Sequence, residues 1–191
     1  MYSVNVTLRG IAPLLQHKFP LPELSTVAKG SSRSTGSKDY TQEWRDYFYA
    51  DKAGIYQPSA HILGAMTKAA AAFKISGKRG KTYKDLMQSS IIITPDRIPH
   101  HMAVPDELDD DADKPLYLDV RPVVVQRARV VRVRPTLHEG WCLEFVIEVA
   151  DDEIHHATLN EILAYAGKAV GIGDFRPRFG RFMVEKFEVV K

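Results

Sequence analysis

The nine residues that decide the fold of this chain are Trp141-Cys142-Leu143-Glu144-Phe145-Val146-Ile147-Glu148-Val149. Apolar residues occupy every second position from Trp141 to Val149, and Glu144 and Glu148 lie between them. This period of two is typical of a strand that turns one face to a core and the other to solvent. A valine-rich strand is predicted just before it, over 123–134, and we expect residues 135–140 to form the hairpin loop that joins the two.

Two helices are predicted, one on each side of this hairpin in the sequence. Ser59 is a suitable N-cap for the first, which continues to Phe73 with apolar residues at helical spacing. The second covers 158–167, where Thr158-Leu159-Asn160-Glu161 has the form of a capping box and Gly167 is a suitable C-cap. A short helix is also expected around 83–87.

Further strands are predicted over 2–9, 91–93 and 181–190. The long elements then follow the order β-α-β-β-α-β, which predicts an α+β fold, a modified ferredoxin-like or RRM-like antiparallel sheet with two helices. We expect a single domain over 1–191, whose core is formed by residues 2–9, 58–74 and 121–191. Such a sheet has one face free of helices, and RNA-recognition modules of this topology bind RNA there.

Two large insertions, 10–57 and 75–120, then interrupt this core. The first is expected to be a flexible loop, because residues 28–38 are rich in glycine and serine and poor in apolar residues. The second contains the short helix and the short strand at 91–93.

Composition restricts the class of protein. The chain is 45% apolar and 26% charged, as in soluble globular proteins. No apolar run approaches the ~18 residues that span a membrane, and the N-terminus lacks the features of a signal peptide. Cys142 is the only cysteine, which excludes an intramolecular disulfide and a cysteine-based zinc site. We therefore expect a cytoplasmic protein that has no cofactor and no membrane partner.

Charge is distributed unevenly, although the net charge is only +2. Six carboxylates lie within residues 106–113, which leaves about +8 for the rest of the chain. The acidic stretch is expected to be a solvated loop, since its spacing matches no calcium-binding loop. Lysines and arginines gather in two groups, within 74–84 and within 121–134, and such clusters are typical of a phosphate-binding surface.

The segment Gly171-Ile172-Gly173-Asp174-Phe175-Arg176-Pro177-Arg178-Phe179-Gly180-Arg181-Phe182 combines three residue types that suit a nucleic-acid strand. Glycine lets the backbone turn sharply and approach a ligand, arginine binds phosphate oxygens in pairs, and phenylalanine stacks on bases. We call residues 171–181 the glycine loop. The alternative is an ordinary turn with solvated arginines.

Three segments together resemble the RAMP superfamily and, within it, the crRNA-binding backbone subunits of CRISPR effector complexes. They are Ile55-Tyr56-Gln57-Pro58-Ser59-Ala60-His61-Ile62-Leu63-Gly64-Ala65-Met66, the block Val125–Val133 with Gly140 and Trp141–Phe145, and the glycine loop with Arg176, Arg178 and Gly180. His61 and Met66 depart from the family's pattern, so the chain is similar to a divergent or phage-borne relative.

The resemblance implies sequence-independent binding of single-stranded RNA through its backbone. It also implies copies that associate side by side along the strand, other effector subunits as partners, and a thumb-like role for the insertion 75–120.

We expect phosphate contacts from the predicted hairpin, the glycine loop, the basic group and the start of the first helix. The candidates are Arg127, Arg129, Arg132, Arg134, Gly171, Gly173, Arg176, Arg178, Arg181, Lys78, Arg79, Lys81, Ser59 and His61. Phe175 or Phe179 is expected to stack on a base or to pack under the loop. The parity of the arginines changes between Arg129 and Arg132, which predicts a bulge at Val130-Val131.

Three alternatives stay open. The first is a phage-type protein that binds or anneals single-stranded DNA. The second is a RAMP-type ribonuclease that needs no metal. One branch of that superfamily uses a histidine near the first strand as acid or base, for which His17 is the candidate. Another branch cuts target RNA with an aspartate in the loop after the first strand, for which Asp39 or Asp46 is the candidate. The third is a purely structural assembly subunit. The remaining histidines give no metal site, because His100-His101 and His155-His156 are adjacent pairs without a third ligand at a suitable spacing.

Overall fold

The computed structural model describes residues 1–19, 40–125 and 128–190. Within them the fold is α+β with antiparallel sheets, as the sequence predicts. It has four α-helices, and the one at Tyr40–Tyr47 lies within 10–57, where a flexible loop and no helix is predicted. The elements are β1 (Tyr2–Gly10), β2 (Leu14–Leu15), α1 (Tyr40–Tyr47), β3 (Ala50–Asp51), β4 (Gly54–Pro58), α2 (Ser59–Ala70), α3 (Lys84–Ser90), β5 (Ile91–Thr94), β6 (Arg97–Pro99), β7 (Leu116–Val125), β8 (Ala128–Leu137), β9 (Cys142–Val149), α4 (His156–Tyr165), the π-helical turn η1 (Ala166–Val170) and β10 (Phe182–Val190).

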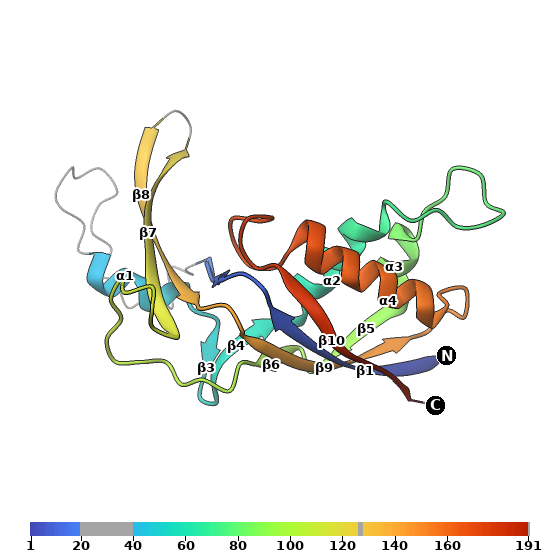
Figure 1. Cartoon of the computed structure of the whole chain (residues 1–191), viewed down its shortest axis with the longest axis horizontal. Coiled ribbons are helices and arrows are strands. Elements are labelled where there is room, and N and C mark those ends of the chain that lie inside the picture. Colours follow the sequence, from blue (N-terminus) through green and yellow to red (C-terminus); the bar gives the residue numbers. More distant parts are fainter. Residues whose placement is uncertain (20–39, 126–127, 191) are drawn as a thin grey trace.

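The central sheet has four antiparallel strands in the order β10-β1-β9-β5. Val4, Val6 and Leu8 of β1 lie opposite Ile147, Phe145 and Leu143 of β9, and all six side chains are buried. Helices α2, α3 and α4 cover this face of the sheet, and the other face has no helix over it (Figure 1). The alternation in 141–149 therefore produces the two-sided strand that the sequence predicts.

The prediction that 123–134 pairs with 141–149 is wrong. Strand β8 pairs instead with β7 and β2, in a second sheet of order β2-β8-β7. The fourth strand of the central sheet is the short β5, which pairs with β9 and lies in the expected second insertion. A valine-rich run suits any half-buried strand, so its composition does not specify its partner.

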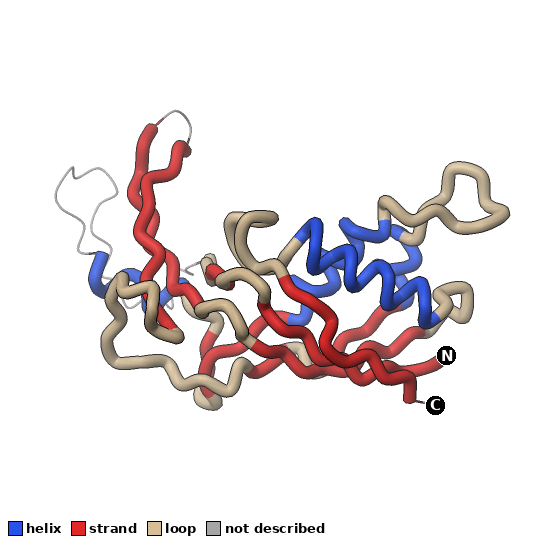
Figure 2. The backbone as a smooth tube through the Cα atoms, viewed as in Figure 1, coloured by secondary structure: helices blue, strands red, loops and turns tan. Residues whose placement is uncertain are grey.

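The β7–β8 hairpin projects beyond the rest of the molecule on the side of the helices (Figure 1), and Figure 2 shows it as two long strands. Its register is continuous from Leu116 opposite Leu137 to Val125 opposite Ala128. There is therefore no bulge at Val130-Val131, contrary to our expectation. Regular alternation places Arg132 and Arg134 on one face of β8 and Val131 and Val133 on the other.

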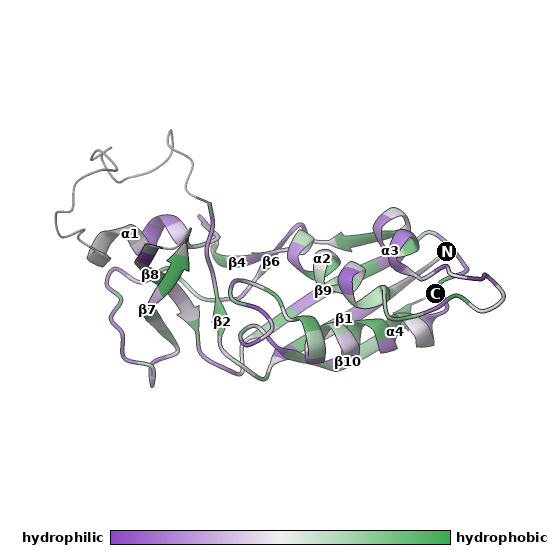
Figure 3. Cartoon of the chain, turned by 90° about the horizontal axis from the view of Figure 1, so that it is seen from above, coloured by the Kyte–Doolittle hydropathy of each residue, from purple (hydrophilic) through white to green (hydrophobic). Residues whose placement is uncertain are grey.

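A second, smaller core lies under the base of this hairpin. It contains Trp44 of α1, Phe48 directly after that helix, Ile55 of β4, Leu118 of β7 and Val133 of β8, all buried. The sheet β3-β4-β6 joins this core to the start of α2. Seen from above, α1, β7 and β8 occupy one end of the long axis, and α2, α3 and α4 lie toward the other (Figure 3).

Both helix starts differ from the caps that the sequence suggests. The N-cap of α2 is Pro58, and the hydroxyl of Ser59 donates to Asp96 Oδ1 at 2.8 Å. The N-cap of α4 is His155, whose Nδ1 accepts from the Ala157 amide, so the helix begins before the predicted capping box. A histidine ring therefore caps α4, and α2 begins without a side-chain cap.

Gly167 is not a C-cap, because the chain continues through η1 to Gly171. Glycine is required at position 167 for a different reason. A Cβ at position 167 would lie 2.2 Å from the Phe182 carbonyl oxygen, so only glycine permits the close approach of η1 to β10.

Candidate nucleic-acid interface

The glycine loop is held against the segment that follows β1. The Ile172 amide donates to the Gly180 carbonyl at 2.9 Å, and the Gly180 amide donates to the Pro13 carbonyl at 2.8 Å. The Asp174 amide donates to the Leu15 carbonyl at 2.9 Å. Gly173 has φ 77°, and a Cβ there would lie 2.5 Å from the Leu15 carbonyl oxygen. The loop therefore has one fixed shape that depends on glycine.

The base of the β7–β8 hairpin is joined to this loop by an ion-pair network. Arg134 Nε donates to Asp174 Oδ2 at 2.6 Å, and its Nη1 lies 3.9 Å from Asp119 Oδ2. Arg121 Nε donates to both oxygens of Asp119, at 2.9 and 2.7 Å. The same guanidinium lies 4.9 Å from the centre of the Phe179 ring. Hairpin and glycine loop are thus positioned as one unit.

Two of the residues predicted to contact nucleic acid are instead buried in contacts within this unit. The Arg134 side chain is only 6% exposed and is paired within the protein, so it acts as a link between the two elements. Phe179 is buried and packs under the loop, which matches the second of the two roles expected for it. A guanidinium already neutralised by a carboxylate offers little to a phosphate.

His17 lies at the centre of the site. Its Nε2 is 3.3 Å from Arg132 Nη1, and its Nδ1 is 3.7 Å from Asp174 Oδ2. Its ring lies 4.6 Å from that of Tyr47. Burial lowers the pKa of His17, and Arg132 and Arg134 lower it further, although Asp174 opposes them. The imidazole is therefore neutral at pH 7.

His61, on the first turn of α2, borders the site from the other side. Its Nδ1 contacts Gln57 Nε2, and its ring meets Tyr49 edge-on at 5.2 Å. Burial lowers the pKa of His61, and the nearby Arg176 lowers it further. This effect places Arg176 of the glycine loop close to α2. Ser59 is buried and bonded to Asp96, so its hydroxyl is already engaged.

Several arginines of this region stay outside the ion pairs of the described residues, which here involve only Arg121 and Arg134. Arg132 contacts His17, and Arg178 lies 6.0 Å from the Phe179 ring. The exposed Arg181 donates to the Pro177 carbonyl. The set with unneutralised charge is Arg129, Arg132, Arg176, Arg178 and Arg181.

The structure does not bring every candidate together. Lys78, Arg79 and Lys81 lie in the loop between α2 and α3, toward the end of the molecule away from the β7–β8 hairpin (Figure 1), and Lys78 pairs with Glu153. Arg127 and Asp39 lie outside the described residues. Asp46 is on α1.

The face of the central sheet that has no helices over it carries more negative than positive charge, which does not suit phosphate binding. Arg9 pairs with Glu185, and Lys186 pairs with Glu188. Glu144 and Glu148 add two further exposed carboxylates on β9. An excess of negative charge repels a phosphate backbone, so the expectation that RNA binds this face is not supported.

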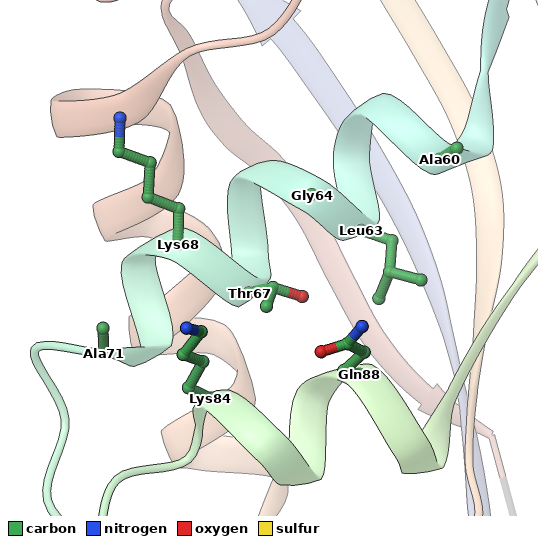
Figure 4. Close-up of a pocket in the computed structure, with 8 residues that line it drawn as sticks. All are labelled: Ala60, Leu63, Gly64, Thr67, Lys68, Ala71, Lys84 and Gln88. Carbon is green, nitrogen blue, oxygen red and sulfur yellow. The ribbon is translucent and has the colours of Figure 1, made fainter.

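A shallow pocket of about 510 Å³ lies between α2 and α3. Leu63 and Thr67 of α2 and Lys84 and Gln88 of α3 are among the residues that line it, and the Lys68 side chain points away from α3 (Figure 4). It belongs to elements on the side of the molecule away from the hairpin. Among the described residues no three His, Cys, Asp or Glu side chains form a group that would hold a metal ion. No helix in the described ranges is long and apolar enough to cross a bilayer.

Sequence reasoning missed Asp119, Arg121 and Asp174 as parts of the site. Asp119 and Arg121 are two residues apart on β7 and therefore share a face, which is a signal for an ion pair once the strand is placed. The contact of Asp174 with Arg134 spans 40 residues, and no local pattern marks it.

No protein-family model and no curated protein matches the sequence. Among solved structures, the fold is similar to that of a chain in the cryo-EM structure of the Type III-B Cmr-beta bound to cognate target RNA. The TM-score is 0.52 with 14% sequence identity over the whole of this chain. This chain spans about three fifths (61%) of the length of that chain. The comparison shows a shared fold.

Proposed function

We propose that this protein binds single-stranded RNA through its sugar-phosphate backbone, without sequence preference and without catalysis, as a repeating subunit of a CRISPR-like ribonucleoprotein filament. The observation that carries the proposal is the set of unneutralised arginines around the glycine loop and the β7–β8 hairpin, above all Arg132, Arg176 and Arg178. These cations come from two elements far apart in the sequence, and the ion-pair network fixes them relative to one another. Likeness in fold to a chain from an RNA-bound assembly supports the same reading.

We also propose that the central sheet, with α2 and α4, is a modified ferredoxin-like core in which β5 is the second strand. The strand order β10-β1-β9-β5 supports it. In such a core, the segment 11–18 that follows β1 and the glycine loop that precedes β10 lie at the same end of the sheet. The base of the β7–β8 hairpin also lies there.

The site suits backbone binding better than base reading. Guanidinium groups bind phosphate oxygens in pairs, and a positively charged groove follows the backbone whatever the bases are. Burial lowers the pKa of both His17 and His61, so both rings are neutral at pH 7. His61 Nδ1 accepts from Gln57 Nε2, so its Nε2–H can donate to a phosphate oxygen. By contrast, His17 Nε2 accepts from Arg132 and its Nδ1 is buried beside Asp174. A phosphate close to either ring would raise its pKa, so binding takes up protons and strengthens as pH falls toward 6.

The experiment is a salt titration of the dissociation constant for single-stranded RNA, measured by fluorescence anisotropy. Each of the single variants Arg132→Ala and Arg176→Ala should weaken binding of all sequences alike and reduce the slope of log K against log salt by about 0.7. The matched control is Arg9→Ala with Lys186→Ala, because both cations lie on the sheet face without helices. An equal loss in the control, or no binding by the wild type, contradicts the proposal.

The same titration with DNA of matched sequence separates the closest alternative. If DNA binds more tightly than RNA, the protein is a single-stranded-DNA-binding protein that uses the same phosphate contacts.

A second candidate function, metal-independent RNA cleavage, is favoured by the position of His17 between Asp174 and Arg132. A carboxylate that orients an imidazole beside an arginine is a suitable arrangement for proton transfer at a phosphodiester. Incubation with RNA in EDTA tests it. Cleavage that disappears in His17→Ala would replace the non-catalytic proposal.

A further inference from the structure

Phe175 is an exposed aromatic residue in a conformation that aromatic residues rarely adopt. Its φ is 55°, and its side chain is 43% exposed. Left-handed backbone is uncommon for residues other than glycine and asparagine and costs on the order of 1–3 kcal/mol. A glycine at position 175 would adopt the same φ without that cost. The phenylalanine side chain must therefore provide a contact that glycine would lack.

The surrounding contacts hold Phe175 in this conformation. The preceding residue, Asp174, is fixed at its amide by the Leu15 carbonyl and at its carboxylate by Arg134. The Phe175 carbonyl accepts from the Phe179 amide at 3.3 Å. The Phe175 ring stacks on the buried Phe179 ring, with 5.6 Å between centroids and 25° between planes. The ring is thus supported from within the protein and open to solvent.

Guanidinium groups surround this ring. Arg121 lies 5.7 Å and Arg134 5.9 Å from its centre. Arg176 follows it directly in the sequence, is exposed, and stays outside the ion pairs of the described residues. Arg121 and Arg134 are paired with Asp119 and Asp174, so Arg176 is the cation beside the ring that can meet a phosphate. Phe175 and Arg176 together supply the two components of a single-strand binding site, a stacking surface and a cation for the adjoining phosphate.

We propose that Phe175 is a stacking platform that holds one unstacked base of the bound strand on each copy of the protein. This inference rests on the proposed function and adds to it a single base contact. The base lies on the open side of the Phe175 ring, and the phosphate next to it meets Arg176. Because every base has a π-face, the contact adds affinity without reading the sequence.

The first test uses the wild-type protein and a single-stranded RNA in which all uridines are 5-iodouridine. Irradiation links iodouridine to aromatic side chains that stack on it, and mass spectrometry of the digested complex locates the link. We expect the modified peptide to contain Phe175. A link found only at other aromatic residues overturns the inference.

The second test compares Phe175→Leu and Phe175→Trp in RNA binding at fixed salt. Leucine keeps the apolar contact with Phe179 but has no aromatic face, so it should weaken binding about 5- to 100-fold, the range expected for loss of one stacked base. Tryptophan should bind at least as tightly as the wild type. The matched control is Tyr165→Leu, since Tyr165 is equally exposed at 43% but contacts Phe73 and no arginine of the site.

The outcomes separate this inference from the proposed function. Binding that depends on Arg132 and Arg176 but is unchanged in Phe175→Leu overturns the platform and leaves backbone binding intact. No RNA binding by the wild type overturns both.

Discussion

At the scale of single residues, sequence neighbours of the same type have different roles. Arg132 and Arg134 lie on one face of β8, yet Arg134 is buried against Asp174 while Arg132 stays outside the ion pairs of the described residues. Phe175 and Phe179 stack on each other, but only Phe175 is exposed. Burial distinguishes the members of both pairs, and in the arginine pair the buried member also has a carboxylate partner.

His100 provides the residue-scale prediction. It is buried, neither ring nitrogen has a hydrogen-bond partner among the described residues, and its ring meets Trp141 edge-on at 6.3 Å. Burial lowers its pKa to about 4, with a smaller effect from His101. The unfolded chain, with a histidine pKa near 6.5, therefore takes up a proton first as pH falls. Stability is greatest above pH 6.5 and decreases between pH 6.5 and 4.

Between pH 7.5 and 5, His100 should lower the free energy of unfolding by about 2 kcal/mol. His100→Leu removes this titration and the unpaired ring nitrogens, so the variant should be at least as stable at pH 7.5 and should lose about 2 kcal/mol less on acidification. Urea unfolding at the two pH values measures the difference. The same pH dependence in variant and wild type would contradict the assignment.

At the scale of elements, local pattern predicts a strand or helix well but not its partner. Strand β9 and helices α2 and α4 follow from alternation and helical spacing. The pairing of β9 with β5, and of β8 with β7, depends on which surfaces remain to be covered after the chain collapses. Strand β7 ends at Val125 and β8 begins at Ala128, inside the run 123–134 that is predicted as one strand, and no glycine, proline or asparagine in that run marks a break.

Replacing one glycine in η1 and one in α2 by alanine tests how closely these elements pack. In Gly167→Ala the new Cβ meets the carbonyl oxygen of Phe182, which belongs to a sheet strand and cannot move freely. We expect this variant to lose about 2 kcal/mol or more, as overpacked cores do. In Gly64→Ala, in the middle of α2, the Cβ meets nothing within 4 Å, and alanine should add about 0.5–1 kcal/mol. Thermal unfolding of both variants measures the contrast, and a similar effect of both would contradict the packing described for η1.

At the scale of the whole molecule, charge is separated between surfaces. Unneutralised arginines gather at the glycine loop and hairpin, whereas the sheet face without helices carries Glu144, Glu148, Glu185 and Glu188. The net charge of +2 conceals this separation. An RNA strand is therefore expected to follow the hairpin side of the molecule and to avoid the outer face of the sheet.

If copies lie side by side along the strand, the number of copies bound should increase in whole steps with RNA length. Light scattering after size exclusion, with RNAs of increasing length in moderate salt, counts them. The double variant Arg132→Ala with Arg176→Ala should lower the fraction of RNA sites occupied at every RNA length. It should not change the increase in RNA length that adds one copy. A constant ratio of one copy per RNA, whatever its length, would contradict the repeating-subunit arrangement.

Alternation and helical spacing in the sequence are enough to predict the strands of the central sheet and the helices that cover it, because periods of two and 3.6 record which face of an element is buried. The sequence also marks the arginines and the glycine loop as candidates for the site. It does not show that β5 completes the sheet, that Arg134 is a buried link or that Arg132, His17 and Asp174 meet, and these features appear in the folded chain. Burial and ion pairing join residues far apart in the sequence, such as Arg134 with Asp174 and Arg9 with Glu185, and therefore depend on the whole packed chain and not on its local pattern.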